Sequence, residues 1–192
     1  METKLFAAYM AGHCTEVTAW RLLRDVASQS VEQGFRVPVS PYSVCIDDDG
    51  GFCLTEPTVP SVEGFEAPEV LGDGLKTEAS QVWALAATLF YVMMGCQIMN
   101  GKGGRGQHER SRIPYLRNEL PELSELLQHC LHYNPARRPS MKAVLQQAST
   151  QYERCLSDIS RGPRLKPADH PAVAMQQQKS LDTWPEQMVA VK

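Results

Sequence analysis

Most of the chain shows the three- and four-residue spacing of apolar positions that is typical of helices. Thr15 is a suitable N-cap, and apolar residues follow it at steps of three and four: Val17, Trp20, Leu23 and Ala27. This pattern predicts a helix over 15–32, ended by Gly34. Residues 82–94 are apolar apart from Thr88, which predicts a buried helix that begins at about Thr77 and ends at Gly95. A helix that opens at Pro121 and another over about 140–152 complete the pattern.

Two short apolar runs, 44–46 and 52–54, flank the sequence Asp47-Asp48-Asp49-Gly50-Gly51. An Asp- and Gly-rich turn between two such runs predicts a β-hairpin. Glycine and proline residues recur in 56–76, which predicts a loop. The Gly-rich stretch 101–106 is predicted to be a mobile connection. A helix, a small hairpin and then further helices indicate a mainly α fold.

Residues 1–158 are predicted to form one domain, and 159–192 a tail that is mostly disordered. The tail has four prolines, a Gln triplet and few large apolar residues, with Trp184 as a candidate contact for a partner. The apolar start, 5–11, lacks the basic flank and the length of a signal peptide, so we expect a short first helix there.

Charge and cysteine usage exclude several classes of partner. The formal net charge is −3 and no basic face is evident, which argues against nucleic acid. The apolar run 82–94 is shorter than the ~20 residues that a membrane-spanning helix needs. The six cysteines are scattered without a Cys-x-x-Cys pair, which indicates free thiols in a reducing cytoplasm. We therefore expect a cytoplasmic protein without metal, membrane or nucleic-acid partners.

Three motifs, 65–70, 82–85 and 134–140, resemble in order and spacing the C-terminal lobe of protein kinases. The resemblance extends over about 15–152, and the hairpin fixes its register. It implies a protein-kinase-like C-lobe with a small β-hairpin. It also implies a buried ion pair between Glu69 and Arg138, whose loss would leave an unpaired buried charge.

The same resemblance implies that the catalytic positions have been replaced. The family's catalytic and metal-binding residues fall on Arg36, Val37, Pro38, Ser40, Ser43, Glu56, Pro57 and Thr58, and the Asp that braces its catalytic loop falls on Gln81. Pro38 cannot accept a proton, and Glu56 alone is a poor Mg²⁺ site. Only 35 residues precede Arg36, so we expect the nucleotide-binding lobe to be missing. The prediction is a protein that is no enzyme and has no cofactor.

A C-lobe without catalytic residues resembles the kinase non-catalytic C-lobe domain (KIND), a protein-interaction module of signalling proteins. The implied function is a regulatory module that binds a protein or a basic peptide. The candidate groove would comprise Tyr42, Phe52, Glu56, Glu63 and Glu66. One alternative is a degenerate kinase fragment with residual ATP binding or phosphotransfer, in which Glu56 would hold the metal. Another is a domain whose tail, through Trp184, carries the partner contact.

Three local motifs suggest other chemistry, and each has a simpler explanation. Asp47, Asp49 and Glu56 match part of a calcium loop, but the flanking segments have the pattern of strands. The Gly-rich stretch 101–106 has no strand before it, unlike a phosphate-binding loop. His129 and His132 have the spacing of metal ligands on a helix, but the sequence shows no third ligand.

Overall fold

A computed structural model describes residues 3–4, 14–57, 64–74, 76–116 and 120–160. The chain divides into two compact units, Met1–Ser157 and Asp158–Lys192, and of the second only 158–160 are described. The short helix expected over 5–11 and the tail residue Trp184 lie outside the described residues.

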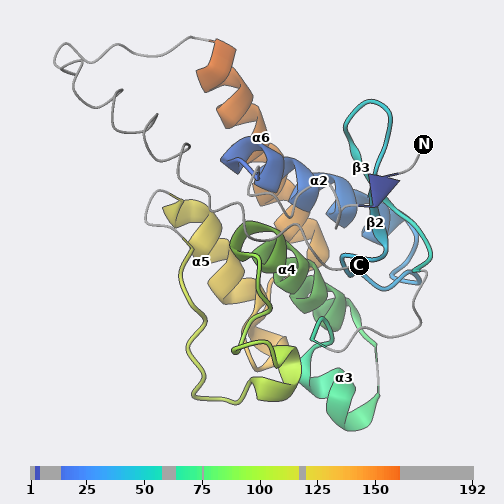
Figure 1. Cartoon of the computed structure of the whole chain (residues 1–192), viewed down its shortest axis with the longest axis vertical. Helices are drawn as coiled ribbons and strands as arrows, with labels where there is room; N and C mark the ends of the chain where they lie inside the picture. Colours follow the sequence, from blue (N-terminus) through green and yellow to red (C-terminus); the bar gives the residue numbers. More distant parts are fainter. Residues whose placement is uncertain (1–2, 5–13, 58–63, 75, 117–119, 161–192) are drawn as a thin grey trace, which may run out of the picture. The chain divides into compact units, whose positions relative to one another are not determined.

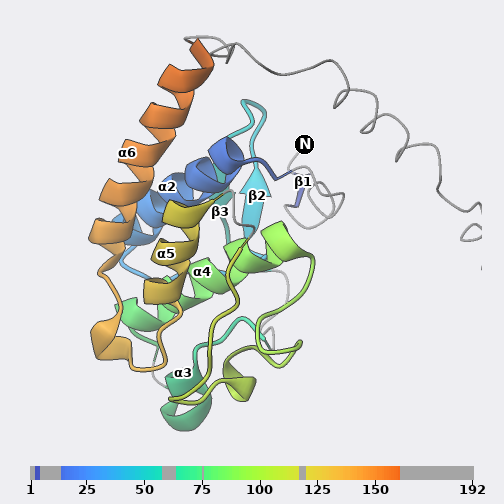
Figure 2. The same ribbon diagram turned by 90° about the vertical axis from the view of Figure 1, so that its left-hand side faces the viewer.

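The fold is mainly α, as the sequence predicts. The described α-helices are α2 (Glu16–Glu32), α3 (Pro68–Asp73), α4 (Glu78–Met94), α5 (Pro121–Cys130) and α6 (Met141–Ser160), joined by the 3₁₀ helices η1 (Gly103–Gly106) and η2 (Pro135–Arg137). In the first unit α4 lies between α2 and α5 (Figure 1). The second view shows α5 packed in front of α4, with α6 running beside it (Figure 2).

The ends of α2 and α4 are set by the capping residues that the sequence predicts. The Thr15 side chain accepts a hydrogen bond from the Thr18 amide at 3.3 Å. At the start of α4, Thr77 and Ser80 form a reciprocal capping box. Gly95 ends α4 in the left-handed conformation, with φ 69°, that glycine adopts without steric cost.

The predicted hairpin is present, as β2 (Val44–Ile46) and β3 (Phe52–Leu54). The Asp47 carboxylate closes its turn by accepting hydrogen bonds from the Asp49 amide at 3.1 Å and from the Gly51 amide. A strand that the sequence did not predict, β1 (Thr3–Lys4), pairs antiparallel with β2. The sheet order is therefore β1-β2-β3.

One face of α2 covers the outer edge of β3 with polar side chains. The Gln29 side chain donates to the Phe52 carbonyl at 2.7 Å and accepts from the Leu54 amide at 2.8 Å. Asp25 Oδ2 accepts from the Phe52 amide at 3.2 Å. These bonds satisfy backbone groups that an exposed strand edge would leave open to another chain.

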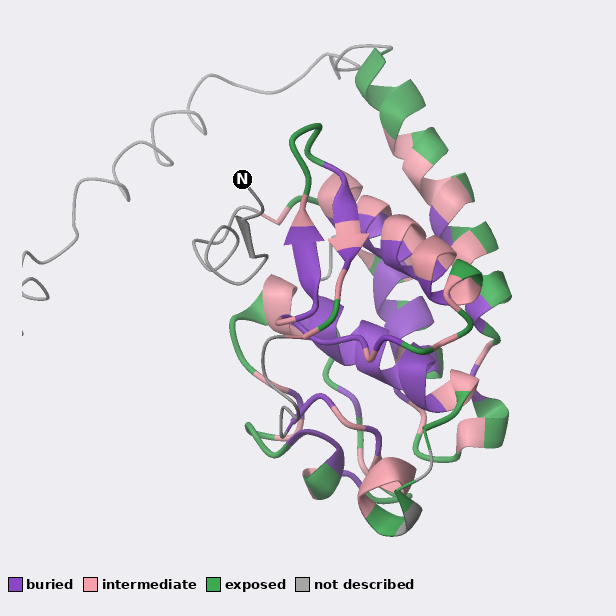
Figure 3. Cartoon of the chain, turned by 90° about the vertical axis from the view of Figure 1, so that its right-hand side faces the viewer, coloured by how far each residue is buried: buried purple, intermediate pink, exposed green. Residues whose placement is uncertain are grey.

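The hydrophobic core is centred on α4. Residues 80–90 of this helix are all buried and are coloured purple in Figure 3. Trp83 and Trp20 of α2 both have no accessible surface. Burial in the core thus explains the apolar run as far as Phe90, whereas 91–93 are half-buried and Met94 is exposed. The part of α6 beyond Ala148 is much more exposed, and Leu156 is 41% accessible.

Two segments are more ordered than their composition predicts. The predicted loop over 56–76 contains α3, which begins at Pro68 and ends at Gly74 in the left-handed conformation. The Gly-rich stretch contains η1, in which Gly103 and Gly104 are buried. A Cβ at Gly103 would collide with the Gly64 backbone, so glycine is needed there for close packing of two backbone segments.

The prediction that all six cysteines are free thiols is wrong for the hairpin. Cys45 and Cys53 lie opposite each other on β2 and β3 and form a disulfide. Sequence spacing did not reveal it, because the pairing register decides which residues oppose each other. Cys14, Cys96, Cys130 and Cys155 are not in disulfides.

Candidate functional site

The segment 36–43 takes the place of the catalytic loop in the resemblance, and Gln81 of α4 holds it. Gln81 is buried, with 4% of its surface accessible. Its Oε1 accepts a hydrogen bond from the Val39 amide at 3.0 Å, and its Nε2 donates to the Phe35 carbonyl at 3.5 Å. A neutral amide therefore braces this loop where the resemblance implies a carboxylate.

The serine hydroxyls of this segment are used within the segment itself. Ser43 Oγ donates to the Pro38 carbonyl at 2.7 Å and accepts from the Ser40 amide at 2.9 Å. Both serines are buried, and Ser43 has no accessible surface. Their hydroxyls stabilise a turn and do not face an open site.

Two ionisable side chains of the replaced positions, Arg36 and Glu56, are exposed. No group of three potential ligands that could hold a metal ion occurs among the residues that the structure describes. The lone Glu56 carboxylate would provide one oxygen donor group where Mg²⁺ usually has several. The arrangement in this region offers polar contacts but no assembled acid–base pair.

Arg138 and Glu69 form a buried ion pair between the loop before α6 and the first turn of α3. Arg138 Nη1 lies 2.6 Å from Glu69 Oε1, and Nη2 lies 2.9 Å from Oε2, which is a bidentate geometry. The guanidinium also donates to three carbonyls, those of His132, Ala79 and Tyr133. The side chain of Arg138 has no accessible surface. These contacts tie the connection between α5 and α6 to the first turns of α3 and α4.

The residues of the predicted groove differ widely in exposure. Phe52 is a core residue with 3% of its surface accessible, so its assignment to the groove is wrong. It points inward because alternate residues of β3 face the core. Tyr42 and Glu66 are half-buried and Glu56 is exposed, whereas Glu63 lies outside the described residues.

Sequence reasoning missed the aromatic neighbours of Tyr42. Phe65 and Tyr91 pack edge to face, with ring centroids 5.4 Å apart. Burial and the nearby Tyr42 phenol both raise the pKa of Tyr91. Tyr91 is half-buried at the end of α4, where an otherwise apolar helix gains a hydroxyl. A tyrosine near the end of this apolar run is the signal by which sequence reasoning could have found Tyr91. We call Tyr42, Phe65 and Tyr91 the aromatic cluster.

The structure gives local roles to two other candidate motifs. His132 Nδ1 lies 3.0 Å from the Asn134 amide, so the imidazole stabilises the turn before η2. The carboxylate of Asp47 is used in the hairpin turn. Neither observation requires a bound ion.

A comparison with protein families matches residues 58–148 to the model described as protein tyrosine and serine/threonine kinase. This part of the chain is kinase-like. The match includes Gln81 and both partners of the Glu69–Arg138 ion pair. It begins at Thr58, so that all the replaced positions except Thr58 and Gln81 precede it, and it covers a little under half of the chain.

Within the described part of the chain, every helix is too short or too polar to cross a membrane.

Proposed function

We propose that this chain is a non-catalytic, kinase-like C-lobe, a pseudokinase similar to KIND, that binds a protein or a basic peptide and regulates signalling. The observation that carries the proposal is the hydrogen bonding of the segment 36–43. Its buried hydroxyls and the Val39 amide bond to the segment itself and to Gln81. These bonds hold the loop in shape, and they leave neither serine hydroxyl available to take part in a reaction.

Phosphoryl transfer makes demands that these residues do not meet. The reaction needs a side chain that orients the acceptor hydroxyl and metal ions that neutralise charge on the phosphates. Pro38 stands at the position of the catalytic Asp in the resemblance and has no proton acceptor on its side chain. Ser43, at the position of the metal-binding Asn, is enclosed. These substitutions support a binding role.

The half-buried members of the aromatic cluster, Tyr42 and Tyr91, form the surface that we propose for the partner, and the buried Phe65 supports the Tyr91 ring from the core. Half-buried aromatic side chains offer contact area with little loss of conformational entropy on binding. Glu66, also half-buried, lies directly after Phe65 in the sequence, and Glu56 is exposed. Carboxylates beside aromatic rings favour a partner with basic residues, through electrostatic complementarity.

A binding experiment tests this surface. Fluorescence anisotropy with a labelled twelve-residue peptide rich in Lys and Arg should show binding by the full chain and weaker binding by Tyr91→Ala. The matched control is Tyr133→Ala, at an exposed tyrosine next to η2. Equal affinity in all three proteins, or equal binding of a Glu-rich peptide, would contradict the proposal. A variant truncated after residue 160 tests the alternative that Trp184 makes the contact.

The enzymatic alternative has its own signature. If the chain binds Mg-ATP through Glu56, nucleotide will raise the melting temperature of the wild-type protein by several degrees. That increase will be absent in Glu56→Ala. We expect no shift in either protein.

We also propose that the protein acts in the cytoplasm, which the free, exposed thiol of Cys96 supports. The Cys45–Cys53 pair makes the location testable, because a reducing compartment keeps such pairs as thiols. If the pair that the structure joins is reduced in the cell, rapid alkylation of protein from freshly lysed native cells under denaturing conditions will label all six cysteines, the result that a cytoplasmic location requires. Labelling of only four would place the protein in an oxidising compartment.

A further inference from the structure

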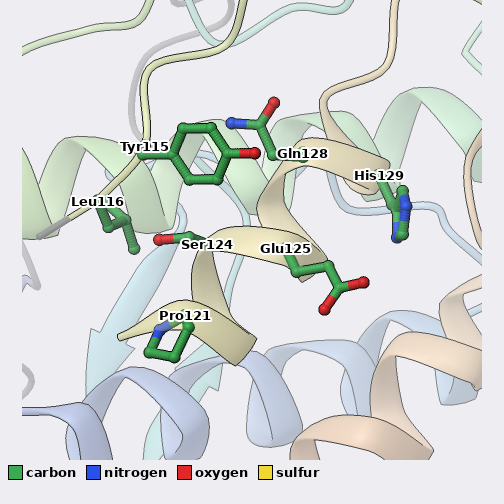
Figure 4. A pocket seen from close by; sticks show the side chains of 7 residues that line it. All are labelled: Tyr115, Leu116, Pro121, Ser124, Glu125, Gln128 and His129. Atoms are coloured by element: carbon green, nitrogen blue, oxygen red, sulfur yellow. The ribbon is translucent and has the colours of Figure 1, made fainter. Parts of the chain in front are cut away.

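A second surface, on α5, is formed by residues that the proposed function does not use. A cavity of about 490 Å³ lies between this helix and the segment that precedes it. Tyr115 and Leu116 form one wall (Figure 4). Pro121, Ser124 and Glu125 line the other along the first turns of α5, with Gln128 and His129 beyond them. We call this cavity the α5 pocket.

The floor of the α5 pocket contains a hydroxyl without a partner. Ser124 is buried, with 3% of its surface accessible, and its Oγ makes no hydrogen bond with the part of the chain that is described. A serine hydroxyl in a helix commonly adds a bond to the carbonyl four residues earlier, but the Leu120 carbonyl accepts from the Ser124 amide and Ser124 Oγ adds no such bond. A buried hydroxyl left unpaired costs free energy, so a ligand that bonds to it gains that energy on binding.

The polar atoms around Ser124 are mostly acceptors. Gln128 Nε2 donates to the Ile113 carbonyl at 2.8 Å, which leaves its Oε1 available as an acceptor. The exposed carboxylate of Glu125 has no ion pair with any described residue. Among the described residues that line the pocket there is neither lysine nor arginine, and His129 at its far rim is the one of them that can carry a positive charge. This arrangement favours a cationic ligand that brings several donors.

The helix dipole at the start of α5 does not reverse the preference of the pocket for a cationic ligand. The positive end of a helix dipole acts mainly on its first turn, where Glu122 offsets it. Glu125 lies one residue beyond Ser124, in the second turn, where the dipole has a smaller effect. The dominant charge inside the pocket is therefore the Glu125 carboxylate.

Besides the Glu125 carboxylate, the pocket has the flat aromatic ring of Tyr115. Its side chain is exposed, with 72% of the residue surface accessible, and its ring stands over the cavity (Figure 4). A guanidinium stacks on an aromatic ring and still donates in its own plane, whereas an ammonium is a compact point charge. We propose that the α5 pocket binds an arginine side chain of a partner protein. The guanidinium would stack on Tyr115 and donate to Glu125, Gln128 Oε1 and Ser124 Oγ.

This proposal rests on the proposed function only in taking the ligand to be part of a protein. It assigns a second contact, separate from the aromatic cluster and on a different helix. A partner that uses both surfaces would present an arginine apart from its main basic segment.

The test is a titration of the full ¹⁵N-labelled chain with the tripeptide N-acetyl-Gly-Arg-Gly-amide, followed by amide NMR shifts. We expect saturable shifts at Ser124, Glu125 and Gln128. The citrulline tripeptide, which keeps the shape but not the charge, should bind at least three-fold more weakly. Glu125→Gln should weaken arginine binding three- to five-fold, the range of a partly exposed ion pair. The matched control is Glu153→Gln, an exposed carboxylate on α6 with the same change in net charge.

Ser124→Ala sharpens the result, because it removes a hydroxyl that has no partner in the free protein. It should weaken binding about two-fold without lowering the melting temperature. Equal binding of arginine and citrulline peptides, or wild-type affinity in Glu125→Gln, would overturn the proposal. Stronger binding of an acidic tripeptide would overturn it in favour of an anion site. If the arginine tripeptide causes no amide shifts in α5 while the basic peptide still binds at the aromatic cluster, the α5 pocket is no arginine site. The proposed function is then unaffected.

Discussion

The segment 36–43 and the Glu69–Arg138 junction both belong to the kinase resemblance, but they use polar groups in different ways. At the junction, a buried guanidinium pairs with a half-buried carboxylate and also donates to three carbonyls. In the segment, the buried polar side chains are neutral: Ser40, Ser43 and the bracing Gln81. The junction has a buried charge away from the position of the reaction in the resemblance, whereas the buried polar groups at that position are neutral.

This difference separates the requirements of the scaffold from those of catalysis. A buried ion pair fixes the relative position of loops regardless of what the protein binds. Neutral hydrogen bonds between Gln81, Val39 and the serines keep the loop in shape without a proton acceptor. A chain that keeps the residues of the scaffold and replaces those of catalysis is expected to fold as a kinase-like lobe. It is expected to bind a partner without carrying out phosphoryl transfer.

The largest effect is expected at the junction. Arg138→Ala should lower the free energy of unfolding by about 3–5 kcal/mol, because it leaves the Glu69 carboxylate half-buried and unpaired. The neighbouring exposed Arg137 is the matched control, and Arg137→Ala should change stability by less than ~0.5 kcal/mol. Urea denaturation measures both. Similar values for the two variants would contradict a structural role for the pair.

A smaller effect is expected at the brace of the segment 36–43. Gln81→Leu should cost about 1–3 kcal/mol, because the buried Val39 amide loses its acceptor. The control is Gln147→Leu, on the exposed face of α6. Chemical denaturation gives the two values. If Gln81→Leu is as stable as the wild type, the loop is held by other contacts and the brace is incidental.

The edge of β3 tests whether side chains of α2 replace a neighbouring strand. Gln29→Leu should cost about 1 kcal/mol, because it removes both bonds to the backbone of β3. Hydrogen exchange of the Leu54 amide should accelerate at least five-fold in this variant. Glu32→Gln, on an exposed position of the same helix, should leave that exchange rate unchanged.

The smallest effect concerns the free thiols. Burial raises the pKa of Cys130 to about 12 and that of Cys14 to about 11. At pH 8 both therefore remain protonated and react slowly, while the exposed Cys96 reacts first with iodoacetamide. Because the folded state binds these protons more tightly, their contribution to stability is complete below about pH 9 and is lost as pH rises above it. Rapid labelling of Cys130 in folded protein would contradict its enclosure.

The sequence predicted what periodicity and caps determine. Thr15 and Gly95 mark the ends of their helices through local geometry, and the hairpin follows from its turn residues. The kinase-like motifs led to the Glu69–Arg138 pair, whose partners are far apart in sequence. Local patterns alone would not have predicted that Glu69 and Arg138 form a pair.

Features that depend on long-range packing were missed. Gly103 looks like part of a mobile linker until the Gly64 backbone is placed against it. Phe52 was assigned to a groove because its apolar run does not show which alternate residues face the core. The Cys45–Cys53 disulfide and the unpaired Ser124 hydroxyl likewise depend on how segments pack.

The central claim is that the segment 36–43 and Glu56 cannot support phosphoryl transfer. The most direct test incubates the full wild-type chain with Mg²⁺ and γ-labelled ATP, alone and with a general acceptor protein, and measures both released phosphate and labelled protein. The account predicts neither above the protein-free blank. Label transfer by the wild-type chain that is lost in Glu56→Ala would contradict it.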